Sequence, residues 1–288
     1  MGVEYNAVQF LRYAAKKAQF GRVATIGRQS MDINEEQLRR VVALPAEYKH
    51  ERYCERFLTE YFNAESVESF DYSDFEGADH IEDLNKPLGK QYSRYDTVLD
   101  FGCLEHIYNV PQAFKNLSEL CSEGGQIIHI LPANNMCAHG FWQFSPELFF
   151  SLYSKANGYA ETQVFLADLS REELWYQLTP PENGQRIILN SCARLSLLCR
   201  TVKGPAFSHD NVQQSDYVFW WAQNAGANAK TDVGNPPSVG KKRERPVRRD
   251  LMSRFMQSVR YMRANMKGEL TVQGKCPEIT KCPISSLV

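Results

Sequence analysis

The chain has 288 residues, of which 43% are hydrophobic, and its formal net charge is −1. That length can bury a substantial core, either as one α/β domain with an appendage or as two small domains. Residues 241–267 hold ten basic and two acidic residues, which leaves −9 for the rest of the chain. No run of about 18 apolar residues occurs, which excludes a membrane-spanning helix.

Eight cysteines are scattered along the sequence, at positions 54, 103, 121, 137, 192, 199, 276 and 282. None of them forms a Cys-x-x-Cys pair, so the spacing supports neither a zinc framework nor a redox pair, and no bound metal is expected. Residues 1–5 lack the basic and then apolar layout of a secretory signal. We therefore expect reduced structural thiols and a cytoplasmic location.

The first predicted elements are a helix, a strand and then further helices. Residues 6–20 place their apolar side chains on one helical face, and residues 22–29 follow as the first strand of a sheet and its turn. Between residues 32 and 64 the pattern predicts one or two helices. One starts at Asn34, and the longer one covers residues 48–58.

Two acidic residues lie at the next predicted strand and turn. Asp71 ends the strand of residues 67–72, and a carboxylate at that place can accept hydrogen bonds from both ribose hydroxyls of an adenosine. A second acid, Asp83, lies just before the turn that residues 85–88 are expected to form. An aspartate that serves only its own turn is the alternative for each, because aspartate before a turn is common for local hydrogen-bonding reasons.

The clearest pattern is a strand, a helix and a second strand in the centre of the chain. Residues 95–101 are short, apolar and β-branched, as is typical of a buried strand. Pro111 opens a helix whose apolar spacing continues to Gly124-Gly125, and residues 126–131 form the second buried strand. Two such strands joined by one helix predict a βαβ unit and hence a parallel sheet.

Chemically useful side chains follow both of these strands. Cys103, Glu105 and His106 come directly after the first, at the carboxyl edge where open α/β sheets bind ligands. The loop after the second strand holds His139, followed by Gly140 and the aromatic residues Phe141, Trp142 and Phe144. His139 is the best candidate for a base, because histidine titrates near neutral pH; a loop histidine that caps a backbone carbonyl is the alternative.

The rest of the chain predicts an edge to the sheet and an extension. Residues 146–153 form a helix, and residues 159–166 and 194–202 are strand candidates that would supply an antiparallel edge. From residue 224 to 246 the composition changes to Gly, Ala, Asn, Pro and Lys, which is typical of a flexible linker.

A basic amphipathic helix is predicted over residues 248–266. Such a segment could meet an acidic partner, a nucleic-acid backbone or an anionic membrane surface. It could equally dock on the acidic remainder of its own chain or on a second subunit. We favour docking, because the aromatic or glycine interleaving usual in polyanion-binding segments is lacking.

The run from Asp96 through Glu105-His106, the following helix, Gly124-Gly125 and the next strand resembles the fourth and fifth strands of class I S-adenosylmethionine-dependent methyltransferases. The resemblance covers roughly residues 20 to 205. It implies S-adenosyl-L-methionine as cofactor, an antiparallel strand at the sheet edge, and cofactor contacts from Gly27, Arg28, Asp71, Asp83, Leu84, Phe101 and Cys103. It places Glu105, Phe141 and Trp142 at the substrate, and His139 and His106 at the reaction.

The glycine-rich turn of that family departs from its usual pattern in this chain. Gly27 is the one glycine kept, Thr25 stands at the usual acidic position, and Gln29 and Met31 occupy the later glycine positions. Glycines there let the backbone approach the cofactor closely. The dinucleotide fingerprint Gly-x-Gly-x-x-Gly is absent as well, which argues against a dinucleotide fold.

The predicted fold is therefore α/β: a Rossmann-like, doubly wound, mostly parallel sheet with an antiparallel edge strand and a helical C-terminal extension. The predicted parts are an N-terminal helix (1–20), a methyltransferase-like Rossmann domain (21–205), a variable region with linker (206–246) and the basic helical extension (247–288).

Three functions of different classes remain open. The favoured one is O- or N-methylation of a small molecule, sugar or natural-product scaffold by in-line transfer, with a histidine as base. The second is a nucleic-acid methyltransferase that uses the basic helix, although the chain lacks an Asn/Asp-Pro-Pro-Tyr/Phe motif and a nucleic-acid partner is disfavoured. The third is a non-catalytic descendant of the fold. The sequence does not decide whether the chain forms a homo-oligomer.

Overall fold

The computed structural model describes residues 2–89, 93–171, 173–191, 193–227, 256, 259, 271–272 and 278–288. The chain divides into two compact units. The first comprises Met1–Pro180, Ala193–Gln213 and Glu278–Val288, and the second comprises Pro181–Cys192 and Gln214–Pro277. No helix among the described residues is long and apolar enough to cross a membrane.

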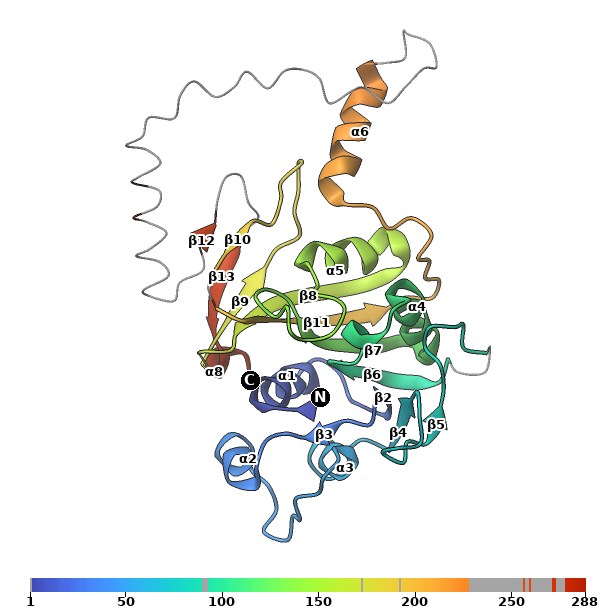
Figure 1. Cartoon of the computed structure of the whole chain (residues 1–288), viewed down its shortest axis with the longest axis vertical. Helices are drawn as coiled ribbons and strands as arrows, with labels where there is room; N and C mark the ends of the chain where they lie inside the picture. Colours follow the sequence, from blue (N-terminus) through green and yellow to red (C-terminus); the bar gives the residue numbers. More distant parts are fainter. Residues whose placement is uncertain are drawn as a thin grey trace. The chain divides into compact units, whose positions relative to one another are not determined.

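A mixed sheet of nine strands forms the centre of the first unit, in the order β13-β9-β8-β11-β7-β6-β2-β4-β5 (Figure 1). Its parallel strands are β2 (Arg22–Ile26), β4 (Ser66–Asp71), β5 (His80–Ile81), β6 (Tyr95–Phe101) and β7 (Cys121–Pro132). Its antiparallel partners are β8 (Tyr159–Asp168), β9 (Leu174–Leu178), β11 (Leu195–Lys203) and β13 (Ile279–Pro283). A short parallel pair, β1 (Gly2–Val3) with β3 (Ser30–Met31), lies outside this sheet.

The order of the parallel strands fixes where a ligand crevice can form. β2 comes first in the chain and lies in the middle, with β4 and β5 on one side and β6 and β7 on the other. From β2 the chain moves outward to β4 and β5, and it then crosses back to form β6 on the other side of β2. The strand order therefore reverses at the gap between the neighbouring strands β2 and β6. In open α/β sheets the ligand crevice lies outside the carboxyl ends of the strands at such a reversal.

The antiparallel half of the sheet is larger than the sequence predicted. Both predicted strands, 159–166 and 194–202, are present as β8 and β11, but β11 lies inside the sheet, between β7 and β8. Two further strands, β9 and β13, extend the sheet beyond β8. The description "mostly parallel with one edge strand" is therefore wrong, because half of the pairings between neighbouring strands are antiparallel.

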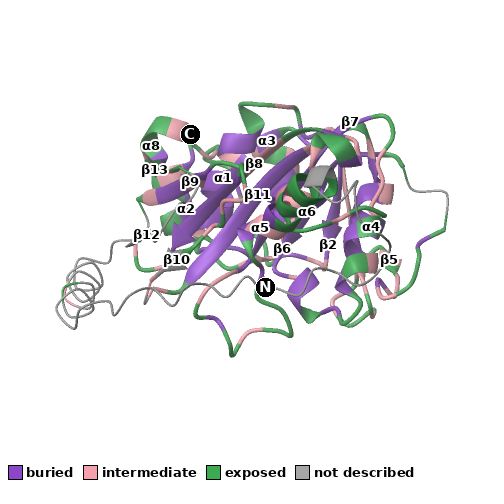
Figure 2. Ribbon diagram, turned by 90° about the horizontal axis from the view of Figure 1, so that it is seen from above, coloured by how far each residue is buried: buried purple, intermediate pink, exposed green. Residues whose placement is uncertain are grey.

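Helices cover both faces of the sheet. Helices α1 (Tyr5–Ala15), α2 (Glu35–Val41) and α3 (Glu55–Phe62) share a core with the strand residues Leu99, Phe101, Ile128 and Ile130. Asp100 and His129 alternate with these residues and so face the other way, where α4 (Val110–Leu120) and α5 (Pro146–Leu152) pack through aromatic side chains. Figure 2 shows how fully β6, β7 and β11 are buried between these layers.

Helix positions were predicted with mixed success. Asn34 does cap α2, since its side chain and that of Gln37 form reciprocal bonds to the backbone. The helix predicted over 48–58 instead begins at Glu55. The reason is a pairing with a distant segment: Met31 N–H donates to the Arg52 carbonyl, and Cys54 N–H donates to the Gln29 carbonyl. Those groups are therefore not available to a helix.

The Gly124-Gly125 pair does not end the preceding helix as predicted. The helix ends at Leu120, and β7 begins at Cys121 and runs through both glycines. A Cβ at Gly125 would lie 2.8 Å from the Cys121 sulfur and 3.0 Å from the Asp96 carbonyl oxygen. The glycine is thus needed where the register of β6 and β7 shifts.

The described C-terminal residues differ from the prediction of a helical extension. Residues 248–266 lie outside the described residues except for Met256 and Val259, and residues 279–283 form the strand β13, followed by the one-turn helix α8 (Ile284–Leu287). In the second unit, α6 (Ser215–Ala227) extends into the predicted linker, and β10 (Leu189–Asn190) pairs with β12 (Thr271–Val272). Arg186 and Asp216 form an ion pair there.

A polar cluster away from the carboxyl edge makes the first unit sensitive to pH. The Tyr159 hydroxyl lies 2.7 Å from the Ser118 hydroxyl and 2.8 Å from His209 Nε2. Burial lowers the pKa of His209 to about 4, and the positive charge of Lys115 adds to the effect. Between pH 6.5 and 4 the unfolded chain therefore binds more protons at this residue than the folded chain does.

We expect His209→Gln to flatten the decline of stability between pH 6.5 and 4, because glutamine keeps a polar partner for Tyr159 and does not titrate. The wild-type loss assigned to His209 should be about 1–2 kcal/mol, since partial solvent access screens the burial effect. Urea denaturation of both proteins at several pH values measures this loss in the free energy of unfolding, with pH 8 as the reference. If the free energy of unfolding fell equally with pH in the two proteins, His209 would not have this role.

Candidate functional site

The turn after β6 is shaped by a buried carboxylate. Asp100 is fully buried, and its Oδ1 accepts hydrogen bonds from the backbone N–H groups of Cys103 (3.0 Å) and Leu104 (3.3 Å). Its Oδ2 lies 2.8 Å from His129 Nδ1 on β7, and His129 Nε2 lies 2.7 Å from the Tyr153 hydroxyl. His129 is therefore a core residue. Asp100 was missed, although an acid inside an apolar strand is a readable signal.

Glu105 lies in the short 3-10 helix η1 (Leu104–His106) that this turn begins. Its side chain is fully buried, and Oε1 lies 3.1 Å from His139 Nε2 and 3.8 Å from His106 Nε2. The histidines are more open, with side-chain exposures of 45% for His106 and 40% for His139. The structure therefore brings together three of the predicted site residues at the carboxyl ends of β6 and β7.

The environment of Glu105 disfavours its charged form. Burial raises the pKa of Glu105 to about 8, and repulsion from Asp100 adds to the rise. Burial likewise lowers the pKa of His106, and the neighbouring His139 adds to that effect. A carboxyl group that is kept from ionising by its surroundings, at the edge of a crevice, is a typical feature of a functional site.

The loop that carries His139 is fastened to the turn that carries Glu105. The Glu105 carbonyl accepts the N–H groups of Phe141 (2.7 Å) and Trp142 (3.3 Å). Gly140 has φ +72°, and a Cβ there would lie 2.7 Å from the Glu105 Cγ and carbonyl oxygen. Only glycine allows this close approach. Trp142 Nε1 also donates to the Ile107 carbonyl (2.9 Å), whereas the Phe141 side chain is 70% exposed.

A hollow of about 200 Å³ adjoins the Glu105–His139 pair. Phe101, a predicted cofactor contact, is among its lining residues, and the lining also includes residues that the sequence did not single out, among them Gly2, Glu4, Asp32, Met136, Arg194 and Ser196. The pKa of Glu4 is raised by burial and by Asp32. These residues come from the N-terminal segment, the turn after β3, the loop after β7 and the start of β11, and nothing in their local sequence marks them as site residues.

The carboxyl ends of β2 and β4 meet beside this turn. Asp71 Oδ2 accepts the Arg28 N–H (3.3 Å), and its Oδ1 accepts the Tyr72 N–H (2.7 Å). Gly27 has φ +71°, and a Cβ there would lie 3.6 Å from the Cys103 sulfur, which shows how closely the ends of β2 and β6 approach each other. Burial raises the pKa of Cys103 well above its ordinary range, so this thiol is unsuited to nucleophilic chemistry.

The remaining predicted cofactor residues, Arg28, Asp83 and Leu84, each make contacts within the protein. The Arg28 guanidinium pairs with Glu55 (2.7 Å) and donates to the Glu76 and Gly77 carbonyls. The Glu82 N–H donates to the Asp71 carbonyl, so the turn with Asp83 begins beside Asp71. Asp83 itself accepts from Asn85 and pairs with Lys86. Leu84 is buried, and its carbonyl accepts from Asn116 on α4.

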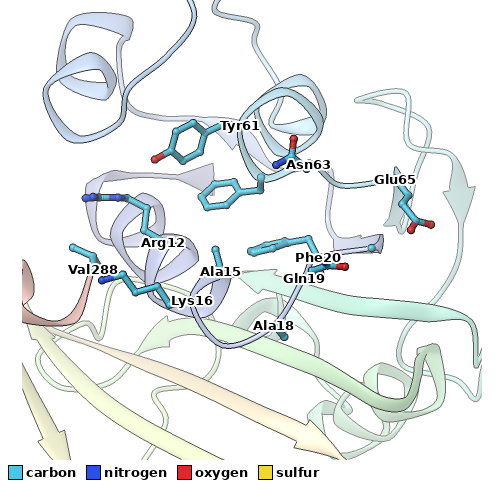
Figure 3. Close-up of a pocket in the computed structure, with 12 residues that line it drawn as sticks. Arg12, Ala15, Lys16, Ala18, Gln19, Phe20, Tyr61, Asn63, Glu65 and Val288 are labelled. Carbon is cyan, nitrogen blue, oxygen red and sulfur yellow. The ribbon is translucent and has the colours of Figure 1, made fainter.

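A second cavity, of about 510 Å³, lies at the opposite edge of the sheet. Figure 3 shows Arg12, Phe20 and Tyr61 around it. Gly21, which also lines this cavity, directly precedes β2, so the cavity opens at the amino end of that strand. Ligand crevices of open α/β sheets lie at the carboxyl ends. We therefore place the candidate site at the hollow next to Glu105.

Comparison with known proteins finds structural likeness alone. No protein-family model matches the chain, and no curated protein matches it significantly. Many solved structures of S-adenosylmethionine-dependent methyltransferases match it at low sequence identity.

Three of these structures illustrate the similarity. The N-methyltransferase NodS from Bradyrhizobium japonicum WM9 is 12% identical, with 68% of this chain and 93% of NodS covered and a TM-score of 0.38. A possible histamine N-methyltransferase from Thermotoga maritima is 14% identical (70% and 90% covered, TM-score 0.39). The 1,6-didemethyltoxoflavin-N1-methyltransferase from Burkholderia thailandensis, with bound 1,6-didemethyltoxoflavin and S-adenosylhomocysteine, is 12% identical (70% and 79% covered, TM-score 0.39). These matches assign neither substrate nor catalytic residues to this chain.

The fastening of the His139 loop can be tested at Gly140. We expect Gly140→Ala to lower the free energy of unfolding by about 2–5 kcal/mol, of which about 1–2 comes from the left-handed backbone and about 1–3 from overlap with Glu105. Gly124→Ala is the matched control, because Gly124 has φ +75° and nothing lies within 4 Å of the added Cβ. Urea denaturation compares the two variants, and equal losses would mean that the loop does not pack on Glu105.

Proposed function

We propose that the chain is an S-adenosylmethionine-dependent methyltransferase that acts on a small-molecule acceptor, at an oxygen or a nitrogen. The observation that carries the proposal is the meeting of Gly27, Asp71 and the Cys103–Glu105 turn at the point where the strand order reverses. A nucleotide-like ligand binds at that point in open α/β sheets. The low-identity structural matches are compatible with the proposal, but it does not rest on them.

The residues at the carboxyl ends of β2 and β4 suit the proposed cofactor. Each carboxylate oxygen of Asp71 accepts one backbone N–H, which leaves acceptor capacity for ribose hydroxyls. Gly27 has no side chain in the gap between β2 and Cys103. Gln29, which replaces a glycine of the family turn, is buried, and its Oε1 has no hydrogen-bond partner. An ammonium group, such as that of the methionine part of the cofactor, would give this orphaned acceptor a donor.

The bound cofactor supplies a methyl group on a sulfonium, which needs no further activation. The protein then has to align the acceptor, exclude water and receive a proton. Phe141 offers an exposed ring in the loop that is fastened to Glu105, and Trp142 is held by its bond to the Ile107 carbonyl. The Glu105–His139 pair lines the hollow and is the place for the acceptor's proton to go.

Asp71 provides the test of this proposal. We expect Asp71→Asn to weaken binding of S-adenosylhomocysteine by about 10- to 100-fold, because hydrogen bonds to a charged group are worth about 1.5–3 kcal/mol. Isothermal titration calorimetry with S-adenosylmethionine, S-adenosylhomocysteine and NAD measures the affinities. Asparagine keeps an acceptor for the Arg28 N–H, so the fold should survive.

Asp74→Asn is the matched control, because Asp74 lies at an exposed position three residues further on. Its affinity for the ligand should equal that of the wild type. An absence of binding in the wild-type protein would overturn the proposal and leave a non-catalytic protein with this fold. Tighter binding of NAD would assign the crevice to a dinucleotide.

A further inference from the structure

We propose that Glu105, His106 and His139 bind one divalent transition-metal ion at the carboxyl edge of β6 and β7. Each of the three can offer one ligand atom, and these atoms lie within 4.8 Å of one another. The cysteine spacing in the sequence had led us to expect no metal. The structure joins residues 33 positions apart, and none of the local metal-binding motifs has that spacing.

One of the two distances to Glu105 fits coordination of a single ion, and the other is slightly longer. Metal–ligand bonds of about 2.0–2.2 Å place neighbouring ligand atoms roughly 2.8–3.6 Å apart in tetrahedral or octahedral geometry. His139 Nε2 and Glu105 Oε1 are 3.1 Å apart, and His106 Nε2 is 3.8 Å from the same oxygen. Small rotations of the half-exposed imidazoles would bring all three atoms onto one ion.

The fully buried Glu105 side chain lacks a partner that a cation would supply. Its Oε1 meets the histidines, but its Oε2 is shielded from solvent and has no hydrogen-bond partner. A buried polar atom without a partner costs stability. A metal ion bound at this carboxyl group would compensate both oxygens at once.

The site is held rigid enough to select a geometry. The Glu105 carbonyl accepts two N–H groups of the loop that carries His139, and Gly140 allows this loop to lie directly on Glu105. Asp100 in turn fixes the backbone just before Glu105 through the amides of Cys103 and Leu104. Ligands supported in this way by a second layer of hydrogen bonds are typical of metal sites.

The ligand set indicates the class of metal. Two imidazoles and one carboxylate are the ligands of catalytic zinc and of other first-row transition metals, whereas Mg²⁺ and Ca²⁺ prefer oxygen ligands. Three protein ligands leave at least one coordination position open, and the hollow beside Glu105 and His139 gives access to it.

A use of this ion in methyl transfer rests on the function proposed above. An acceptor hydroxyl bound at the open position would have its pKa lowered by the ion. His139 would then act as a ligand through Nε2, and the hydroxyl proton would pass to solvent water in the hollow. The resulting alkoxide oxygen would take the methyl group from the sulfonium, whose S–C bond breaks to leave S-adenosylhomocysteine. Metal binding itself does not depend on the presence of S-adenosylmethionine.

The test is metal binding by the full chain. Protein stripped with a chelator is titrated with Zn²⁺ in a competing buffer, and bound metal is counted by mass spectrometry after dialysis. We expect one Zn²⁺ bound per chain and much weaker binding of Mg²⁺. His106→Ala and His139→Ala should each weaken Zn²⁺ binding by more than about 100-fold, because even loss of an outer partner costs about 10- to 100-fold. Glu105→Gln, which keeps the shape of the side chain, should do the same.

Cys137→Ser is the control, because Cys137 is an exposed thiol two residues before His139 and could bind zinc adventitiously. This variant should bind Zn²⁺ as the wild type does. Circular dichroism shows whether each variant is folded, and the visible spectrum of the Co²⁺-loaded protein reports the coordination of the ion independently of activity.

The outcomes separate the two proposals. Absence of stoichiometric Zn²⁺ binding, or binding that survives in a His106→Ala/His139→Ala double variant, overturns the metal site. Binding lost in Cys137→Ser overturns it too, because the thiol would then be the ligand. Zn²⁺ binding without binding of S-adenosylhomocysteine supports the metal site and removes the methyltransferase function. Binding of S-adenosylhomocysteine without binding of Zn²⁺ supports the methyltransferase function and removes the metal site.

Discussion

The buried carboxylate of Asp100 is the constraint on which the rest of the site depends. A buried carboxyl group is costly unless its oxygens are hydrogen-bonded. Asp100 meets this requirement by binding His129 of the neighbouring strand with one oxygen and two backbone amides of the following turn with the other. The first bond ties β6 to β7 and, through Tyr153, to the end of α5. The second bends the chain so that Glu105 turns inward.

The inward position of Glu105 explains both its raised pKa and the attachment of the neighbouring loop to its backbone. The side chain lies near a second carboxylate in a region with little water, so its neutral form is favoured. Its backbone carbonyl meanwhile faces the loop after β7 and holds Phe141 and Trp142. The turn after β6 and the loop after β7, which are separate in the sequence, are thus joined by hydrogen bonds. This arrangement suits the binding of a proton, a substrate or a metal ion.

Local pattern was enough for the central elements of the fold. The strands β6 and β7 and the helix between them follow from apolar periodicity and from Pro111, and the strand ends then place Asp71 and Glu105 at the carboxyl edge. The prediction was wrong where distant segments compete for backbone hydrogen bonds. Residues 52–54 pair with residues 29–31 and so delay α3, and β7 uses Gly124-Gly125 because β6 lies against it.

The sequence by itself determined the parallel βαβ unit at the centre of the sheet, the acidic residue at the end of β4 and the candidate residues Glu105, His106 and His139, because each depends on residues close in the chain. Only the tertiary structure decided that the antiparallel half of the sheet is extended by β9 and β13, that Glu4, Asp32 and Arg194 line the hollow, and that Glu105 is fully buried between two histidines. The physical reason is that distance, burial and hydrogen-bond partners are set by packing between strands and loops far apart in sequence, which local spacing does not encode.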